Sequence, residues 1–321
     1  MLSHLLVIDS LKLGLVGTVA EPIVQINNLT IEKGESLGLV GESGSGKTLT
    51  ALSIMKLLPK RVRLLNGHII FDGTDLTSLN ENQMYRLRGH KIGLVFQEPA
   101  AALDPLFTIG NQVTEALHFY RNGRERRERA LTLLSEVGLP NPERVLNLYP
   151  HEMSGGMKQR VMIAIAIANN PELLIADEPT TALDATLQKQ VLSLIHGLVV
   201  SRNISLLVIS HDLNVVRYLC DRISVMYAGK IVESAEREEL FNDPKHPYTQ
   251  LLLASMLTNK SRDEQQLLHI KGDVPDPSHF PTGCRFHPRC PYTMDICRSD
   301  EPPLLEKQRD HSVACHLYDK S

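Results

Sequence analysis

The chain has 321 residues, 42% of them hydrophobic and 22% charged, which is enough for a globular α/β domain with an appendage. A formal net charge of −3 gives no electrostatic reason to expect a nucleic-acid partner. The longest apolar runs, such as residues 161–168, are far shorter than the ~20 residues of a membrane span. The first residues lack the basic region of a signal peptide. We therefore expect a cytosolic protein whose five cysteines are thiols or metal ligands.

The chain begins with a region that predicts strands and turns over residues 5–35, with short strands at 23–26 and 29–31. Residues 36–40 are typical of a short buried strand, and residues 49–56 of a helix. The eight residues between them match G-x-x-x-x-G-K-[ST], the pattern of a phosphate-binding loop. They are Gly41, Glu42, Ser43, Gly44, Ser45, Gly46, Lys47 and Thr48.

This loop has the chemistry that a nucleoside triphosphate requires. Its glycines allow the backbone N–H groups to point at an anion, and the N-terminus of the following helix adds partial positive charge. Lys47 is expected to neutralise the β- and γ-phosphates, and the Thr48 hydroxyl to ligate Mg²⁺. A glycine-rich turn with a stray lysine is the alternative, but the strand before the loop and the helix after it disfavour that interpretation.

The middle of the chain predicts a strand at 67–73 and an apolar run at 91–96 that ends on Gln97. Residues 100–150 then form a helical insert, with helices expected at 109–120 and 125–137. A basic cluster in this insert alternates with glutamates, which favours a solvated helix face. The cluster consists of Arg121, Arg124, Arg126, Arg127 and Arg129.

The strand pattern resumes at residues 173–176, which lead into Asp177 and Glu178. A helix at 185–200 and a strand at 205–210 follow, and this alternation predicts a parallel sheet. In such sheets ligands gather beyond the carboxyl ends of the strands. One crevice is therefore expected to collect the phosphate loop, Gln97, Asp177, Glu178 and His211.

Each of these side chains has a chemical role open to it. Asp177 is a hard carboxylate at a strand end, which suits Mg²⁺, and Gln97 can reach both the metal and a water. Glu178 can act as the general base toward that water, and His211 can hydrogen-bond the γ-phosphate. Ser154, Gly155 and Gly156 open a further helix, expected at 157–169, and this second anion-binding terminus suggests that another molecule's nucleotide is gripped.

In this order the motifs resemble those of the ATP-binding subunit of ABC transporters, over nearly the whole chain. Residues 41–48 are similar to its Walker A loop, Gln97 to its Q-loop, and residues 154–157 to its signature. The remaining motifs are Walker B at 173–177, the catalytic base Glu178, the D-loop Ala182-Leu183-Asp184 and the switch histidine His211.

The resemblance implies an α/β fold with a P-loop NTPase (RecA-like) core and a helical subdomain at about residues 100–160. It also implies an ATPase that binds ATP and Mg²⁺ in a head-to-tail dimer, where each signature completes the partner's site, and a membrane subunit in contact with residues 97–105. The aromatic residue that usually stacks on adenine is missing near Gly14, and Leu15 is expected to replace it.

The pattern leaves the ATPase core at about residue 236, so residues 1–235 are predicted to form the ATP-binding domain and residues 236–321 an extension. The extension resembles that of the dipeptide/oligopeptide branch, which includes some nickel importers. Its His246-Pro247-Tyr248-Thr249 stretch and its cysteine order carry this resemblance.

Four cysteines lie within about 32 residues of the extension, namely Cys284, Cys290, Cys297 and Cys315. Four thiolates suit an iron–sulfur cluster or zinc. The spacing Cys-x5-Cys-x6-Cys-x17-Cys has no CxxC knuckle, which disfavours zinc. The resemblance favours a [4Fe–4S] cluster and leaves zinc and free structural thiols open. Cys220 is expected to be a small buried residue.

These observations predict the ATPase subunit of a membrane importer for dipeptides or oligopeptides, with nickel or a metal chelate as the alternative cargo. The expected partners are two permease subunits, a second ATP-binding subunit (the same or a related chain) and a solute-binding protein, with no nucleic acid. The subunit is expected to be peripheral, at the cytoplasmic face of the inner membrane. A non-transport ABC ATPase would typically carry a long coiled-coil insertion or two ATPase domains, and a phosphate-loop kinase or GTPase would leave Ser154-Gly155-Gly156 unexplained.

Overall fold

The computed structural model describes residues 4–17, 21–117, 120, 122–181, 183–258, 272–308 and 310–319. The chain divides into two compact units. The first comprises residues 1–32, 36–78 and 210–321, and the second comprises residues 33–35 and 79–209. Within the described residues, none of the helices has the length and apolar character that crossing a membrane requires.

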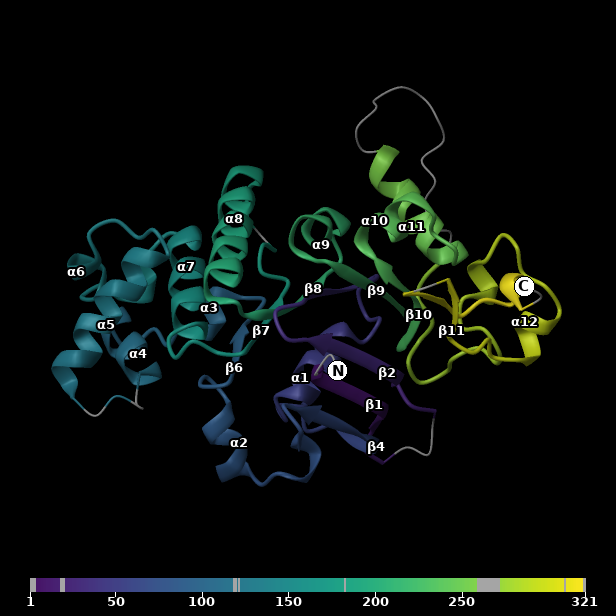
Figure 1. The fold of residues 1–321 in the computed structure, drawn as a ribbon, viewed down its shortest axis with the longest axis horizontal. Helices are drawn as coiled ribbons and strands as arrows, with labels where there is room; N and C mark the ends of the chain where they lie inside the picture. Colours follow the sequence, from purple (N-terminus) through teal and green to yellow (C-terminus); the bar gives the residue numbers. More distant parts are fainter. Residues whose placement is uncertain are drawn as a thin grey trace. The chain divides into compact units, whose positions relative to one another are not determined.

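The first unit is built on a twisted sheet with the strand order β5-β4-β1-β2-β10-β9-β3. Figure 1 shows β1, β2 and β4 side by side, and β1 pairs antiparallel with both neighbours. The two strands expected at 23–26 and 29–31 form one continuous strand, β2. The strands are β1 (His4–Leu15), β2 (Val24–Glu32), β3 (Ser36–Val40), β4 (Val62–Phe71), β5 (Thr74–Asp75), β9 (Arg222–Tyr227) and β10 (Lys230–Glu236).

Every residue of β3 is buried, and β3 runs parallel to β9, so the strand that leads into the phosphate loop lies inside the sheet. Its glycine, Gly38, leaves room for α9, since a Cβ there would lie 2.9 Å from Val216 Cγ1 and 3.1 Å from Cys220 Sγ. Cys220 is fully buried, as predicted. The helical segments of this part of the unit are α1 (Lys47–Ile54), η1 (Leu76–Ser78), α9 (Leu213–Leu219), α10 (Arg237–Asn242) and α11 (Pro247–Thr258).

The C-terminal segment returns to the same sheet. Strand β12 (His311–Val313) pairs antiparallel with β10 and with β11 (Leu305–Gln308), the yellow strand beside β10 in Figure 1. A fully buried carboxylate, Glu233, supports this junction, because it accepts hydrogen bonds from His311 Nε2 at 2.8 Å and from the His246 backbone N–H at 3.0 Å. The short helices of this segment are η3 (His287–Arg289), α12 (Ile296–Ser299) and η4 (His316–Tyr318).

The second unit contains three buried parallel strands in the order β8-β7-β6, which confirms the parallel sheet expected from the alternation of strands and helices. They are β6 (Ile92–Val95), β7 (Leu173–Asp177) and β8 (Ser205–Ser210). Helix α2 (Glu81–Leu87) precedes β6, and α8 (Ala185–Arg202) lies between β7 and β8 in the chain. Together with the sheet of the first unit, these elements confirm an α/β fold.

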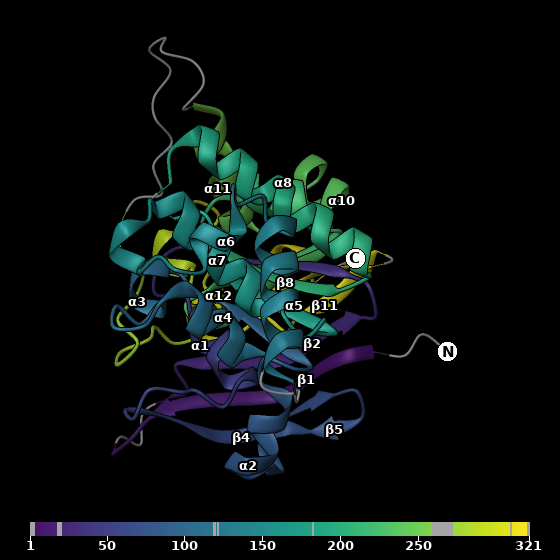
Figure 2. The same cartoon turned by 90° about the vertical axis from the view of Figure 1, so that its left-hand side faces the viewer.

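Between β6 and β7 the described residues form helices and the loops that join them, with no strand (Figure 2). This agrees with the helical insert expected from the sequence. They are α3 (Pro99–Ala102), α4 (Ile109–Ala116), α5 (Gly123–Glu136), α6 (Pro142–Val145), η2 (Pro150–Glu152) and α7 (Gly155–Ala166). The helix expected at 125–137 begins earlier, because the Asn122 side chain accepts a hydrogen bond from the Arg124 N–H at 2.9 Å and caps it. Arg124 pairs with Glu128 on an exposed face of α5, and Arg121 lies outside the described residues.

Candidate nucleotide-binding site

The phosphate loop joins β3 to α1 in the first unit and takes a backbone course that needs glycine. A Cβ on Gly41 would lie 2.0 Å from the Met226 carbonyl oxygen, a backbone atom that cannot move aside. Gly46 has φ +102°, in the left-handed region, and stands at the N-cap of α1. No side chain caps this helix, and a helix N-terminus is a position that favours an anion.

Lys47 bridges the loop from within. Its Nζ donates hydrogen bonds to the carbonyl oxygens of Gly41 at 2.7 Å and Glu42 at 2.8 Å, and to Ser45 Oγ at 3.1 Å. Only 5% of Lys47 is exposed, whereas Thr48 is exposed. The ammonium group is therefore held by oxygen atoms of the loop itself, where its charge suits a phosphate.

Two side chains of the predicted site, Gln97 and Glu178, are in contact in the second unit. Asp177 ends β7 and is 6% exposed, and Glu178 follows with φ 46°, a strained value for a residue that is not glycine. Glu178 Oε2 accepts hydrogen bonds from Thr181 Oγ1 at 2.7 Å and from Gln97 Nε2 at 3.3 Å. The structure thus brings Gln97, two residues after the end of β6, to the carboxylate predicted to be the base.

The Ser-Gly-Gly stretch lies at a helix start in the same unit. Ser154 Oγ accepts a hydrogen bond from the Met157 N–H at 3.3 Å, so α7 begins at Gly155 instead of the expected Met157. Asp184 caps α8 by accepting from the backbone N–H groups of Thr186 and Leu187 at 2.9 and 3.0 Å. Ala182 of the predicted D-loop lies outside the described residues.

The predicted site residues are divided between the two units. The phosphate loop and His211 belong to the first, and Gln97, Ser154, Gly155, Gly156, Asp177, Glu178 and Asp184 belong to the second. His211 is exposed at the end of β8, just before Asp212, which caps α9 by accepting from the Asn214 N–H at 2.8 Å. That all these residues share one crevice stays a prediction.

Comparison with known proteins decides the family. A family model described as "ABC transporter" matches residues 24–181, and one described as "Oligopeptide/dipeptide transporter, C-terminal region" matches residues 232–297. The oligopeptide transport ATP-binding protein AppD of Bacillus subtilis is 48% identical over 305 residues, which span 94% of this chain and 93% of the relative. The chain belongs to the ATP-binding proteins of the ABC transporter family.

Further relatives agree with this assignment. The dipeptide transport ATP-binding protein DppD of Escherichia coli is 43% identical over 289 residues, covering 89% of this ABC protein and 88% of the relative. Among solved structures, a dimeric ATP-binding cassette in a post-hydrolysis state, bound to ADP and Pi, superposes with a TM-score of 0.64 at 33% identity. That match covers 72% of this chain and 98% of the solved one. As a member of a family of ATPases, the ABC protein is expected to use ATP and Mg²⁺.

The four cysteines of the C-terminal segment line one small cavity of about 10 Å³, room for no more than a single water. Burial raises the pKa of Cys284 to about 11 and that of Cys315 to about 12, and it also raises the pKa of Cys290. None of the five cysteines, all of which lie in described residues, forms a disulfide. In the described part of the chain, no group of three or more His, Cys, Asp or Glu side chains is arranged to hold a metal ion. The predicted cluster therefore stays a prediction.

Sequence reasoning missed a contact between this segment and the phosphate loop. Arg289, next to Cys290, forms a two-pronged ion pair with Glu42, with Nη1–Oε2 at 2.7 Å and Nη2–Oε1 at 3.0 Å. Burial alone would lower the pKa of Arg289, but hydrogen bonds to Glu42 and Tyr227 raise it. Tyr248 Oη accepts the Glu42 backbone N–H at 2.9 Å. The His-Pro-Tyr-Thr and Arg-Cys-Pro motifs were the available signals, but one sequence does not show their partner.

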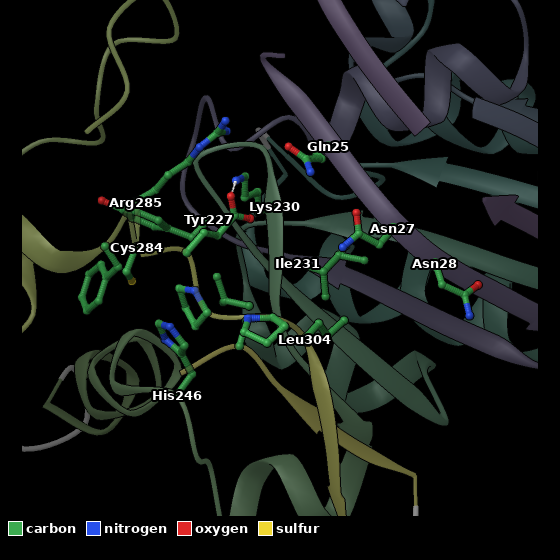
Figure 3. Close-up of a pocket in the computed structure, with 16 residues that line it drawn as sticks. Gln25, Asn27, Asn28, Tyr227, Lys230, Ile231, His246, Cys284, Arg285 and Leu304 are labelled. Atoms are coloured by element: carbon green, nitrogen blue, oxygen red, sulfur yellow. Dashed lines mark ion pairs between the residues drawn. The ribbon is translucent and has the colours of Figure 1, made fainter. Parts of the chain in front are cut away.

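A second cavity, of about 280 Å³, lies between β2 and the C-terminal segment (Figure 3). Figure 3 shows Gln25, Asn27 and Asn28 of β2 on one side, and His246, Cys284 and Arg285 on the other. Lys230 and Glu301 form an ion pair in its wall. Cys284, His246 and Phe286 line both this cavity and the cavity of the four cysteines, so the two are neighbours.

Proposed function

We propose that this ABC protein is the ATP-hydrolysing subunit of an importer for dipeptides or oligopeptides. The observation that carries the proposal is the match of residues 232–297 to the oligopeptide/dipeptide transporter C-terminal region, in addition to the ABC match. The relatives reported above are named for oligopeptide and dipeptide transport, and none of those names refers to nickel or to DNA. The division into an ATP-binding domain at 1–235 and an extension at 236–321 belongs to the same proposal.

In this proposal the phosphate loop residues Gly41–Thr48 hold ATP, with Lys47 on the β- and γ-phosphates. Thr48, Gln97 and Asp177 bind Mg²⁺. Glu178 removes a proton from the attacking water, and His211 hydrogen-bonds the γ-phosphate. The hydrogen bond between Gln97 and Glu178 supports the pairing of metal ligand and base, because it places both side chains at one point. An aliphatic contact from Leu15, the last residue of β1, replaces the missing aromatic residue at adenine.

A second ATP-binding subunit, the same or a related chain, completes each site in this proposal. The Ser154 cap leaves the Gly155 and Gly156 N–H groups at the start of α7, where a partner's γ-phosphate is favoured. Asp184 lies at the start of α8, and a Cβ on Gly156 would lie 3.2 Å from Leu187 of that helix. The two helix starts therefore form one surface. The dimeric state of the solved cassette supports this arrangement.

Two permease subunits, with a solute-binding protein outside, supply the membrane path. Exposed apolar side chains lie on both sides of Gln97 in the chain of the second unit: Phe96 is 44% exposed, Leu106 80% and Phe107 53%. Exposed apolar side chains that gather in one region are typical of partner contacts, whereas a single exposed one is common on any protein surface. We place the permease contact here, which puts the subunit at the cytoplasmic face of the inner membrane.

Replacing Leu106 by aspartate is expected to prevent assembly with the permease subunits while ATP binding persists, because a charge would be buried at the contact. Coexpression and purification of the membrane complex measures this. Val200→Asp is the matched control, since Val200 is 66% exposed on α8 of the same unit. The wild-type complex should show ATPase stimulated by a peptide-loaded binding protein. Assembly of the Leu106 variant at the control's level would refute the docking surface, and stimulation by nickel chelates alone would refute the cargo.

We also propose that the four cysteines hold a [4Fe–4S] cluster. Their convergence on one cavity supports this proposal. Hydrogen bonds to sulfur support it as well, because three of the thiols accept from the backbone N–H of the second residue after the cysteine. The N–H groups of Phe286, Tyr292 and Leu317 act in this way on Cys284, Cys290 and Cys315. A four-iron core is larger than this cavity, so the thiols would have to move outward to bind it.

Anaerobic purification is expected to give a coloured protein with iron and acid-labile sulfide, and both should be lost in a Cys290→Ser, Cys297→Ser double variant. Cys220→Ser is the control, because that thiol lies elsewhere in the core. Because burial raises the pKa of Cys284 to about 11, the metal-free thiol stays protonated at neutral pH and should react slowly with iodoacetamide. A colourless, iron-free wild type would rule the cluster out.

A further inference from the structure

Arg289 of the C-terminal segment and Tyr248 of α11 both contact the phosphate loop. We propose that these two side chains are positioning residues of the ATP site. Both act through Glu42, the second residue of the loop. This inference rests on the proposed ATPase function. It gives the cysteine-bearing segment a part in nucleotide binding that is separate from any metal it holds.

Glu42 is held by four residues. Its N–H donates to Tyr248 Oη at 2.9 Å, its carboxylate pairs with Nη1 and Nη2 of Arg289, and its carbonyl oxygen accepts from Lys47 Nζ at 2.8 Å and from the Ser45 N–H at 3.2 Å. The Lys47 bond uses the ammonium group that a triphosphate would recruit. Once Lys47 turns to the phosphates, Tyr248 and Arg289 still tie Glu42 to residues outside the loop.

The two positioning residues stand on a rigid support. Tyr248 and Tyr227 are almost completely buried, and their rings lie 4.7 Å apart, with Phe286 of the C-terminal segment 5.0 Å from Tyr227. The Arg289 side chain is 6% exposed and also donates to Tyr227 Oη at 3.3 Å. An arginine so enclosed, with its two-pronged geometry satisfied, has little freedom to leave the loop.

Charge gives Arg289 a second effect. Glu42 places a carboxylate on the loop that has to bind a triphosphate, and 28% of that side chain is exposed. The guanidinium of Arg289 neutralises it. Without Arg289 the bare carboxylate would repel the nucleotide, and Coulomb's law near a protein surface makes this worth about tenfold in affinity.

The thiol cavity supports the same contact. Helix η3 runs from His287 to Arg289, between two of its cysteines, and the His287 N–H donates to the Cys284 carbonyl oxygen at 2.9 Å. The Cys290 N–H in turn donates to the His287 carbonyl oxygen at 3.3 Å. Arg289 is therefore anchored on both sides by residues that line the cavity of the four cysteines.

The test is the affinity of the dilute, full-length protein for a fluorescent ATP analogue with Mg²⁺. Arg289→Ala should weaken binding about tenfold, and Arg289→Lys, which keeps the charge but not the two-pronged geometry, should lie between it and the wild type. Adding Glu42→Gln to Arg289→Ala should restore much of the affinity by removing the unpaired charge. Tyr248→Phe should weaken binding without such rescue. Arg298→Ala is the control, an exposed arginine on the same segment.

Thermal denaturation identifies variants that fail to fold. If Arg289→Ala is unfolded, Arg289→Lys and the double variant still test the proposal. In the assembled complex the KM for ATP should rise while kcat changes little. Unchanged affinity in a folded Arg289→Ala protein, or no rescue by Glu42→Gln, would overturn the proposal. Failure of the ATPase function itself would differ, because the wild type would then bind ATP but never hydrolyse it.

Discussion

Replacing Glu178 by glutamine is expected to lower steady-state ATP hydrolysis by about 10²- to 10⁴-fold, the usual contribution of a positioned general base. Glutamine has nearly the same shape but cannot accept a proton at neutral pH. Its amide oxygen can still take the hydrogen bond from Thr181 Oγ1, which is 2.7 Å long in the wild type. The fold and the binding of ATP should therefore survive, and the variant should accumulate as a closed dimer with ATP bound.

Phosphate release by the assembled complex measures the turnover, and size-exclusion chromatography with ATP measures the dimer. Glu143→Gln is a suitable control, because Glu143 is an exposed glutamate on α6 of the same unit. Undiminished hydrolysis in the Glu178 variant would show that another group activates the water.

Lys47→Ala is expected to weaken ATP binding by roughly 10- to 100-fold, because one or more charge-assisted hydrogen bonds to phosphate are lost. The same change removes the bonds from Nζ to the carbonyl oxygens of Gly41 and Glu42, so the empty loop should also become less ordered. Lys47→Arg restores the charge, but its larger head does not fit the buried position of Nζ.

Equilibrium binding of a labelled ATP analogue to the dilute protein checks this prediction. Lys60→Ala provides the comparison, because Lys60 is an exposed lysine of the same unit. If the Lys47 and Lys60 variants bound ATP equally well, the assignment of the phosphate loop as the nucleotide site would have to be abandoned.

The parts of this protein that were predictable from sequence are those specified locally. The phosphate loop is one, since its glycines, its buried strand and its helix are consecutive in the chain. Caps are another: Ser154 and Asp184 each bond to an N–H within three residues. The parallel strands β6, β7 and β8 followed from apolar runs separated by helices.

The rest depends on residues far apart in the chain. Glu42 and Arg289 are separated by 247 positions, and nothing around either residue specifies the other. In the same way, β12 pairs with β10 although a long segment lies between them, and the C-terminal segment thereby extends the sheet of the first unit. Long-range pairing is decided by which buried surfaces fit together, and a single sequence does not record this.

The central claim is that the phosphate loop is half of a site, which a second ATP-binding subunit completes through Ser154, Gly155 and Gly156. The most direct measurement is ATP hydrolysis per subunit at saturating ATP, from a dilute monomer verified by light scattering up to the assembled complex. We expect the dilute monomer to bind ATP·Mg²⁺ but to turn it over slowly, with turnover rising as subunits associate. A dilute monomer that hydrolyses ATP as fast per subunit as the complex would contradict the account.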